Sequence, residues 1–315
     1  MTTKVLLGDL SNGSYLKLAV ADAGQRPTAT GIYACASAED FEDAVSGFLA
    51  DNGDPQISGA AFSTSGWEVD GKLDLVHYGF SLHRRQIADL LGVQRLSVCN
   101  DFVAKALAVP VLEDHERVKV CGKDQHPEHV IAVVGPTGGL GGAYLSPDGR
   151  GGWSVTHCEG GHSDFAPRTE QEIEILKLLM KKYDHVSCER GVSSAGLVEL
   201  WDCLCLMAGD EANTPLPEEI LALAYSNDAR ALEAIRIQTE LYASVASDFA
   251  LTMGARGGVY LAGSYLALLD NLFDHDVFAR RFYDKGRVSS YVKDIPVYRI
   301  TAAEPEILGL STVFG

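Results

Sequence analysis

The sequence has little positive charge for its length. Its 315 residues carry 26 Lys and Arg against 43 Asp and Glu, which gives a formal net charge of −17. A surface with this balance repels nucleic acid and anionic membranes, so we expect neither as a partner. An anionic substrate would need local positive groups around its binding site.

Long apolar runs and ordered cysteine pairs are also missing. No run of 18 or more residues is apolar enough to span a membrane, and the N-terminal segment lacks the apolar stretch of a signal peptide. The seven cysteines are scattered, without a CxxC pair or a Cys/His cluster of zinc spacing. We therefore expect reduced thiols and a cytoplasmic protein.

The remaining composition is typical of a globular protein, and the length suffices for a large core and two domains. Short apolar stretches predict strands and longer amphipathic stretches predict helices. In the first hundred residues they alternate as β-β-α-β-α-β. The predicted strands are 4–10, 15–21, 57–62 and 96–99, and the predicted helices are 38–52 and 82–91.

One carboxylate stands where a strand gives way to a helix. The apolar run 96–99 predicts a buried strand, Asn100 and Asp101 follow it, and 103–109 is helical in pattern until Pro110. In open α/β folds, ligands bind at the carboxyl ends of strands. Two interpretations stay open at this point. Either residue is a helix N-cap, or the acid is functional.

Two hairpins with glycine-containing turns begin the two halves of the chain. The first has Asp9 near its tip and the turn 11–14, and the second has the turn 135–142 after the strand 129–134. Such turns can present N–H groups to a phosphate, and an acid can hold a metal through water. Neither turn has Walker or dinucleotide spacing, so ordinary surface turns are the alternative. Together the hairpins suggest a duplicated fold with a nucleotide between the halves.

A polar segment in the second half suits a ligand rich in hydroxyl groups. Glu159 and His162 flank two glycines, so an acid and an imidazole could face one pocket. Glu189 is a further acid of this kind. The alternatives are a polar loop and an exposed acid beside Arg190. The stretch 194–253 is mostly helical in pattern, and its apolar stripes indicate core packing.

The order of these motifs resembles the proteobacterial type of bacterial glucokinase, within the sugar kinase–actin superfamily. The specific blocks are Glu-Gly-Gly-His-x-Asp-Phe-Ala-Pro at 159–167, and Asp-Lys-Gly-Arg at 284–287 with Asp-Ile-Pro-Val-Tyr at 294–298. The resemblance covers nearly the whole chain. It implies an α/β, two-domain, actin-like (ribonuclease H-like) sugar kinase fold with a ligand cleft between domains. The domains expected are a small one, 1–110 plus about 301–315, and a large one, 111–300.

The resemblance also implies a reaction and its residues. ATP would phosphorylate glucose or a similar hexose at the 6-hydroxyl, with Asp101 as general base and Mg²⁺ bridging the phosphates. The implied sugar-binding residues are Asn100, Glu159, His162 and Glu189. The implied nucleotide-binding residues are Asp9, Gly13, Ser14, Thr137, Gly138, Gly139 and Gly263, with Asp9 also near the metal through water.

The phosphate-binding turns depart from the family pattern. The first needs one inserted residue, with Ser14 in place of Thr and Lys17 in place of Arg. In the second, Thr137 comes one position early, and Gly263-Ser264 stands where two glycines are usual. Three hypotheses therefore stay open: an ATP-dependent glucose kinase, a non-catalytic or very slow sugar-binding relative, and a kinase for another sugar or donor. The oligomeric state is also open, with a homodimer as one option.

Overall fold

The computed structural model describes residues 3–11, 13–75, 77–123, 126 and 128–315. The chain divides into two compact units. Unit 1 consists of Met1–Glu113 and Ala302–Gly315, and unit 2 of Asp114–Thr301. The C-terminal segment therefore returns to the unit that contains the N-terminal strands.

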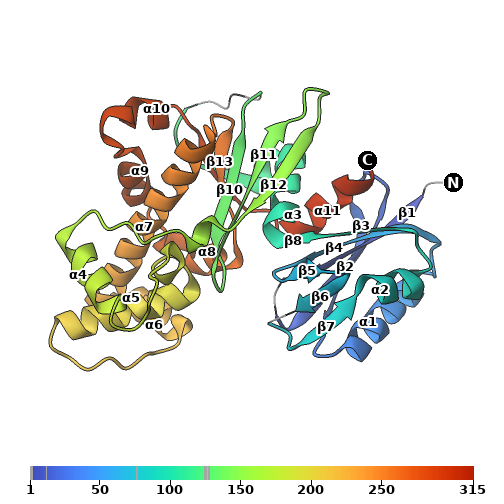
Figure 1. Ribbon diagram of the computed structural model, residues 1–315, viewed down its shortest axis with the longest axis horizontal. Helices are drawn as coiled ribbons and strands as arrows, with labels where there is room; N and C mark the ends of the chain where they lie inside the picture. Colours follow the sequence, from blue (N-terminus) through green and yellow to red (C-terminus); the bar gives the residue numbers. More distant parts are fainter. Residues whose placement is uncertain (1–2, 12, 76, 124–125, 127) are drawn as a thin grey trace. The chain divides into compact units, whose positions relative to one another are not determined.

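Unit 1 is built on a five-stranded sheet in the order β3-β2-β1-β4-β8 (Figure 1). The pairs β1–β2 and β2–β3 are antiparallel, whereas β1–β4 and β4–β8 are parallel. The strands are β1 Lys4–Leu10, β2 Tyr15–Asp22, β3 Pro27–Ala34, β4 Ile57–Thr64 and β8 Arg95–Asn100. The helices are α1 Ala38–Asp51, α2 Arg84–Leu91, α3 Asp101–Ala108 and α11 Pro305–Ser311.

Alternating side chains of β1 supply the cores on the two faces of this sheet. Leu6 and Leu10 belong to a cluster that contains Phe41 and Phe48 of α1. Val5 and Leu7 belong to another, built with residues of α3 and α11. This is the period of two that a strand between two helical layers requires. The helices α3 and α11 thus share one face, although they lie at distant places in the sequence (Figure 1).

The polar passage between β4 and α2 contains structure that the sequence pattern did not predict. It forms a three-stranded antiparallel sheet, β5-β6-β7, with bounds Trp67–Val69, Lys72–Leu75 and Phe80–His83. These strands are too short for apolar alternation to identify them. The predicted helix 82–91 accordingly begins later, at Arg84. The strand β3 was also missed.

Unit 2 repeats this topology. Its sheet has the order β12-β11-β10-β13-β14-β9, and its first five strands show the same succession of antiparallel and parallel pairs as unit 1. The strands are β9 Arg117–Cys121, β10 Ile131–Pro136, β11 Leu140–Pro147, β12 Trp153–Cys158, β13 Gly258–Leu261 and β14 Val297–Ile300. The duplicated α/β fold predicted from the two hairpins is confirmed.

The helices of unit 2 cover this sheet and form its core with it. The longest, α7, runs from Ala229 to Met253, within the stretch 194–253 that was predicted to be mostly helical. The others are α4 Glu170–Leu179, α5 Ser194–Met207, α6 Pro217–Tyr225, α8 Ser264–Leu269, α9 His275–Tyr283 and α10 Ser289–Lys293. Of the helices in the described part of the chain, none has the length and apolarity needed to cross a bilayer.

Candidate active site

Asp101 is the first residue of α3, directly after the carboxyl end of β8. The side chain of Asn100 caps the helix by accepting a hydrogen bond of 2.8 Å from the N–H of Phe102. Asp101 is therefore not the cap, and its buried carboxylate accepts a bond of 2.5 Å from Nζ of Lys105. β8 is an edge strand and only half-buried, so the strand was predicted correctly but its burial was not.

Lys105 joins the end of β8 to the C-terminal helix. Its ammonium group also lies 2.9 Å from Oε1 of Glu306 on α11, and its side chain is 3% exposed. Burial opposes the charge of the lysine, but Asp101 and Glu306 together hold the pKa of Lys105 above its usual range. Burial likewise opposes the charge of Glu306, while Lys105 holds the pKa of that carboxyl below its usual range. The cluster is thus a buried cation shared by two acids.

Asp9 belongs to the same group of charges. It lies near the end of β1 and is buried. Its Oδ1 accepts a hydrogen bond of 2.7 Å from the hydroxyl of Ser63 on β4, and its Oδ2 accepts one of 2.9 Å from the hydroxyl of Ser11. Burial and the charge of Glu306 raise the pKa of Asp9 to about 7, against the opposing effects of Lys105 and Ser63. Asp9 and Asp101 therefore lie in one electrostatic environment at the carboxyl ends of parallel strands.

The rest of the first predicted turn lies beside this cluster in sequence. Gly13 has φ +79°, which favours glycine, and Ser14 is exposed after it. Asn12, the residue between Ser11 and Gly13, lies outside the described residues. The turn is thus a hairpin with an exposed hydroxyl, as expected for a phosphate-binding segment. Its role stays a prediction.

In unit 2, Leu140 connects three of the predicted segments. Its N–H donates a bond of 3.0 Å to Oε2 of Glu189. The carbonyl oxygen of Leu140 lies so close to Gly161 that a Cβ added there would be 1.9 Å from it. The segment 159–162 therefore packs against Leu140. The two loops are also joined directly, because Asp164 and Ser187 form a β-bridge.

Of the predicted turn 135–142, only residues 137–139 lie between strands, immediately before Leu140, because β10 ends at Pro136 and β11 begins at Leu140. The turn is held by a hydrogen bond of 2.7 Å from the N–H of Thr137 to the carbonyl oxygen of Gly139. A Cβ on Gly138 would meet no atom within 4 Å, so this glycine faces open space. Gly263 lies close by. It has φ +112°, and its Cβ would lie 2.1 Å from the carbonyl oxygen of Pro136. The structure therefore brings the predicted phosphate turn and the predicted adenosine turn together.

Glu159 and His162 are exposed and close to each other. Oε2 of Glu159 lies 3.8 Å from Nε2 of His162, and Oε1 lies 3.3 Å from Nε2 of His157. Both groups are thus available to a ligand on the same side of the 3-10 turn Gly160–His162. An acid and imidazoles at this spacing can accept from and donate to neighbouring hydroxyl groups.

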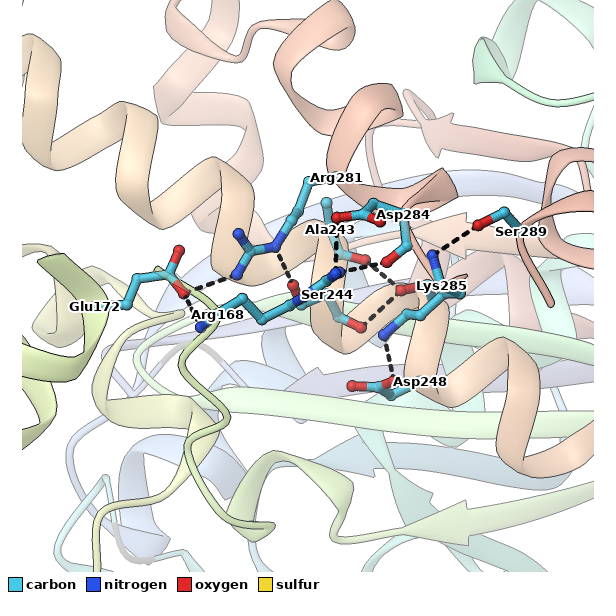
Figure 2. Close-up of polar contacts among 10 residues, drawn as sticks. Arg168, Glu172, Ala243, Ser244, Asp248, Arg281, Asp284, Lys285 and Ser289 are labelled. Carbon is cyan, nitrogen blue, oxygen red and sulfur yellow. Dashed lines mark hydrogen bonds and ion pairs between the residues drawn. The ribbon is translucent and has the colours of Figure 1, made fainter. Parts of the chain in front are cut away.

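The residue after the first specific block contacts the start of the second block in unit 2 (Figure 2). Arg168 directly follows the first block, and Asp284 begins the second. Nη1 of Arg168 donates to the backbone carbonyl of Asp284, and Nη2 donates to its Oδ2 at 2.7 Å. Lys285 of the second block pairs with Asp248 of α7 at 2.5 Å. The second block is therefore bonded both to the residue that follows the 159–167 loop and to α7.

Sequence analysis missed three members of the unit 1 cluster: Lys105, Glu306 and Ser63. The predicted helix 103–109 contains Lys105 but not Asp101, whereas α3 begins at Asp101. A helix predicted from Asp101 onward would have placed the two residues four apart and indicated their pairing. Nothing local pointed to Glu306 or Ser63, which reach the cluster from other elements of the fold.

Direct coordination of a metal is not supported by the side chains. Among the residues described, no group of three or more His, Cys, Asp or Glu is placed to hold an ion. The three acids Asp9, Asp101 and Glu306 nevertheless outnumber the lysines near them, Lys105 and Lys17. This excess of negative charge fits a cation held through water, which is the arrangement the resemblance implied.

The chain matches known proteins along nearly its whole length. Residues 6–315 match the family model for glucokinase. A glucokinase from Chromobacterium violaceum is 40% identical over 275 residues, which cover 86% of this chain and 78% of that protein. A glucokinase from Aromatoleum aromaticum is 35% identical over 310 residues, 98% of this chain and 93% of that protein. The crystal structure of a glucokinase from an Antarctic psychrotroph has a TM-score of 0.88 at 24% identity and covers 100% of this chain and 99% of that one.

Two α/β units with this repeated topology define the class of the protein: it has the two-domain, actin-like fold of sugar kinases. The family match over almost the whole chain, together with the curated relatives, makes the assignment narrower. The chain belongs to the glucokinase family, a family of sugar-phosphorylating enzymes. The predicted family and fold class are confirmed.

Proposed function

We propose that this protein transfers the γ-phosphoryl group of ATP to the 6-hydroxyl of glucose, with Asp101 as general base. The observation that carries the proposal is the placement of Asp101, an ion-paired carboxylate at the start of α3 and after the carboxyl end of a parallel strand. A pure sugar-binding protein has no need of a base there. Family membership supports the reaction class.

The other predicted residues have matching tasks in this proposal. The remaining sugar hydroxyls bond to Asn100, Glu159, His162 and Glu189. A sugar that lacks one of these hydroxyls would leave its protein partner without a hydrogen bond, which lowers the affinity for that sugar. The nucleotide phosphates and adenosine are assigned to Asp9, Gly13, Ser14, Thr137, Gly138, Gly139 and Gly263. Mg²⁺, held near Asp9 through water, would supply neutralisation of phosphate charge. A cytoplasmic location is supported by the seven unpaired cysteines.

In the reaction, Asp101 accepts the proton of the 6-hydroxyl as its oxygen attacks phosphorus. The bond from phosphorus to the β–γ bridging oxygen breaks, and ADP leaves with the electron pair. Phosphoryl transfer depends mainly on positioning and charge neutralisation, with this proton as its acid–base part. The proton acceptor must therefore be ionised before the sugar binds.

The test combines calorimetric titration with glucose, separate titration with Mg-ATP and a coupled assay of ADP release. We expect binding of both and turnover, and we expect Asp101→Ala to abolish turnover while glucose binding stays largely intact. Asp89→Asn is the control, because Asp89 is an exposed helical acid with a side chain 75% exposed. Glucose binding without turnover in the unmodified protein would instead indicate a sugar-binding relative, and an active Asp101→Ala would refute the assignment of the base.

A further inference from the structure

We propose that Lys105 is a positioning residue for Asp101: it holds Oδ2 of the carboxylate so that Oδ1 accepts the proton, and Glu306 fixes the lysine for this task. The inference rests on the proposed function, because it takes Asp101 as the base. It adds two residues to the site that neither the motifs nor the family comparison indicated.

The first step of the argument is the geometry of the Asp101 carboxylate. Nζ of Lys105 lies 2.5 Å from Oδ2, one helical turn along α3. No residue in the described part of the chain donates a hydrogen bond to Oδ1, and the side chain keeps 8% of its exposed area. One oxygen is thus occupied by a charged donor, and the other is left for the substrate hydroxyl.

The second step concerns the lysine itself. A lysine side chain has four rotatable bonds and holds a partner in place only if its own end is fixed. Glu306 contacts Nζ at 2.9 Å, and Nζ lies 4.5 Å from the centre of the Phe102 ring. Because its side chain is only 3% exposed, Lys105 has no alternative partner in water. A salt bridge on a protein surface would not fix a carboxylate in this way.

The third step is the close packing that delivers Glu306. Gly309 of α11 lies so near α3 that a Cβ on it would be 1.8 Å from the carbonyl oxygen of Ala104. This approach lets Glu306, at the start of α11, reach a lysine on the neighbouring helix. The C-terminal helix therefore supplies a residue to the site, and not only apolar surface to the core.

The fourth step is the charge balance around the base. Asp9 from β1, Glu306 from α11 and Cys99 from β8 surround Asp101 and Lys105, with Lys17 of β2 near Glu306. Lys105 is the cation that faces both Asp101 and Glu306. Without it, the two acids would repel each other, and Asp101 would move from its place. A displacement of about 1 Å at a catalytic group can cost ~100-fold in rate.

The experiment separates positioning from a structural role by neutralising both ends of the ion pair. Lys105→Met combined with Glu306→Gln removes both charges of the Lys105–Glu306 pair. It leaves the buried Asp101 without its cation, so some loss of stability is expected. We measure kcat, KM for glucose, the calorimetric Kd for glucose and Tm on the full chain. We expect kcat to fall roughly 10- to 100-fold, with Kd for glucose within about twofold and a lowered Tm from the unpaired Asp101.

A second double variant, Lys105→Gln with Glu306→Gln, returns an uncharged donor to the position. It should recover part of kcat, because an amide can again bond Oδ2. The control is Arg85→Met with Asp89→Asn, an i,i+4 ion pair on α2 whose side chains are 93% and 75% exposed. This pair has the same sequence spacing but lies on the surface, so its removal should leave kcat unchanged.

Each outcome has one meaning. If kcat of the Lys105→Met, Glu306→Gln variant equals that of the unmodified protein, the positioning role is overturned. The ion pair would then contribute nothing to turnover. If removal of Lys105 prevents folding, Glu306→Gln alone decides: a drop in kcat of roughly threefold or more at constant glucose Kd supports the role, and unchanged kcat overturns it. An inactive unmodified protein, or a fully active Asp101→Asn, refutes the proposed function instead.

Discussion

Glu189 accepts a hydrogen bond of 3.0 Å from the backbone N–H of Leu140. This bond ties a predicted sugar-binding acid to the residue that ends the second glycine turn. One carboxylate oxygen is used on the protein, so the other is the one left for a hydroxyl group. The predicted sugar-binding acid and the predicted phosphate turn of unit 2 are therefore joined by one hydrogen bond.

This hydrogen bond predicts different effects for two adjacent glycines. A Cβ on Gly139 would lie 2.3 Å from Oε2 of Glu189, so Gly139→Ala should displace that carboxylate and weaken glucose binding about tenfold, the worth of one hydrogen bond to a charged group. Gly138→Ala is the matched control, because its Cβ meets nothing within 4 Å. Its glucose Kd should be unchanged in the same titration. Equal glucose affinities for both variants would contradict this prediction.

The packing of α11 on α3 predicts a large loss of stability for Gly309→Ala. The added Cβ would lie 1.8 Å from the backbone oxygen of Ala104, which cannot move without separating the helices. We expect a loss of roughly 2 kcal/mol or more in unfolding free energy, typical of overpacking. Gly47→Ala is the control at an exposed position of α1, where an added Cβ would meet no atom within 4 Å. It should stabilise the protein by about 0.5–1 kcal/mol. Urea unfolding of both variants measures the difference, and a neutral Gly309→Ala would show that the helices separate easily.

A buried ion pair in unit 2 predicts a strong dependence on Arg281. Its Nη2 donates a hydrogen bond of 2.7 Å to Oε2 of Glu172, and its Nε donates one of 2.7 Å to the hydroxyl of Ser244 (Figure 2). Arg281→Met would leave Glu172 as a buried unpaired acid, at a cost of about 3–5 kcal/mol. The adjacent, exposed Arg280 gives the control, since Arg280→Met should change unfolding free energy by less than about 0.5 kcal/mol. Thermal or denaturant unfolding measures both, and similar small losses would argue against the buried pair.

The raised pKa of Asp9 predicts how stability changes with pH. Burial and Glu306 raise this pKa from 3.8 to about 7, so between these values the folded chain holds a proton that the unfolded chain has lost. The stabilising contribution of Asp9 therefore falls as pH rises from about 4 to 7. Asp9→Asn removes this dependence, and its stability relative to the unmodified protein should rise between pH 5 and pH 8, by on the order of 1–2 kcal/mol. Denaturant unfolding with EDTA at both pH values tests the sign, and a difference that does not change with pH would refute it.

Local sequence patterns determined much of the fold because they report local physics. Apolar runs and helical spacing identified the strand that leads to Asn100 and the helical stretch that contains α7. They also identified the two glycine hairpins that indicated a duplicated fold. The two specific blocks identified the family. The short strands β5 to β7 were missed because three or four residues carry too little periodicity to distinguish them from a loop. The roles of the candidate site residues stay predictions.

The sequence by itself determined the class of this protein and placed Asp101 where a strand meets a helix. Only the tertiary structure decided which groups surround that carboxylate. Glu306 reaches Lys105 from the far end of the chain, and Ser63 reaches Asp9 from a neighbouring strand. Pattern and propensity act over a few neighbouring residues, whereas these contacts depend on how distant segments pack. The charges around the proposed base are therefore a property of the fold.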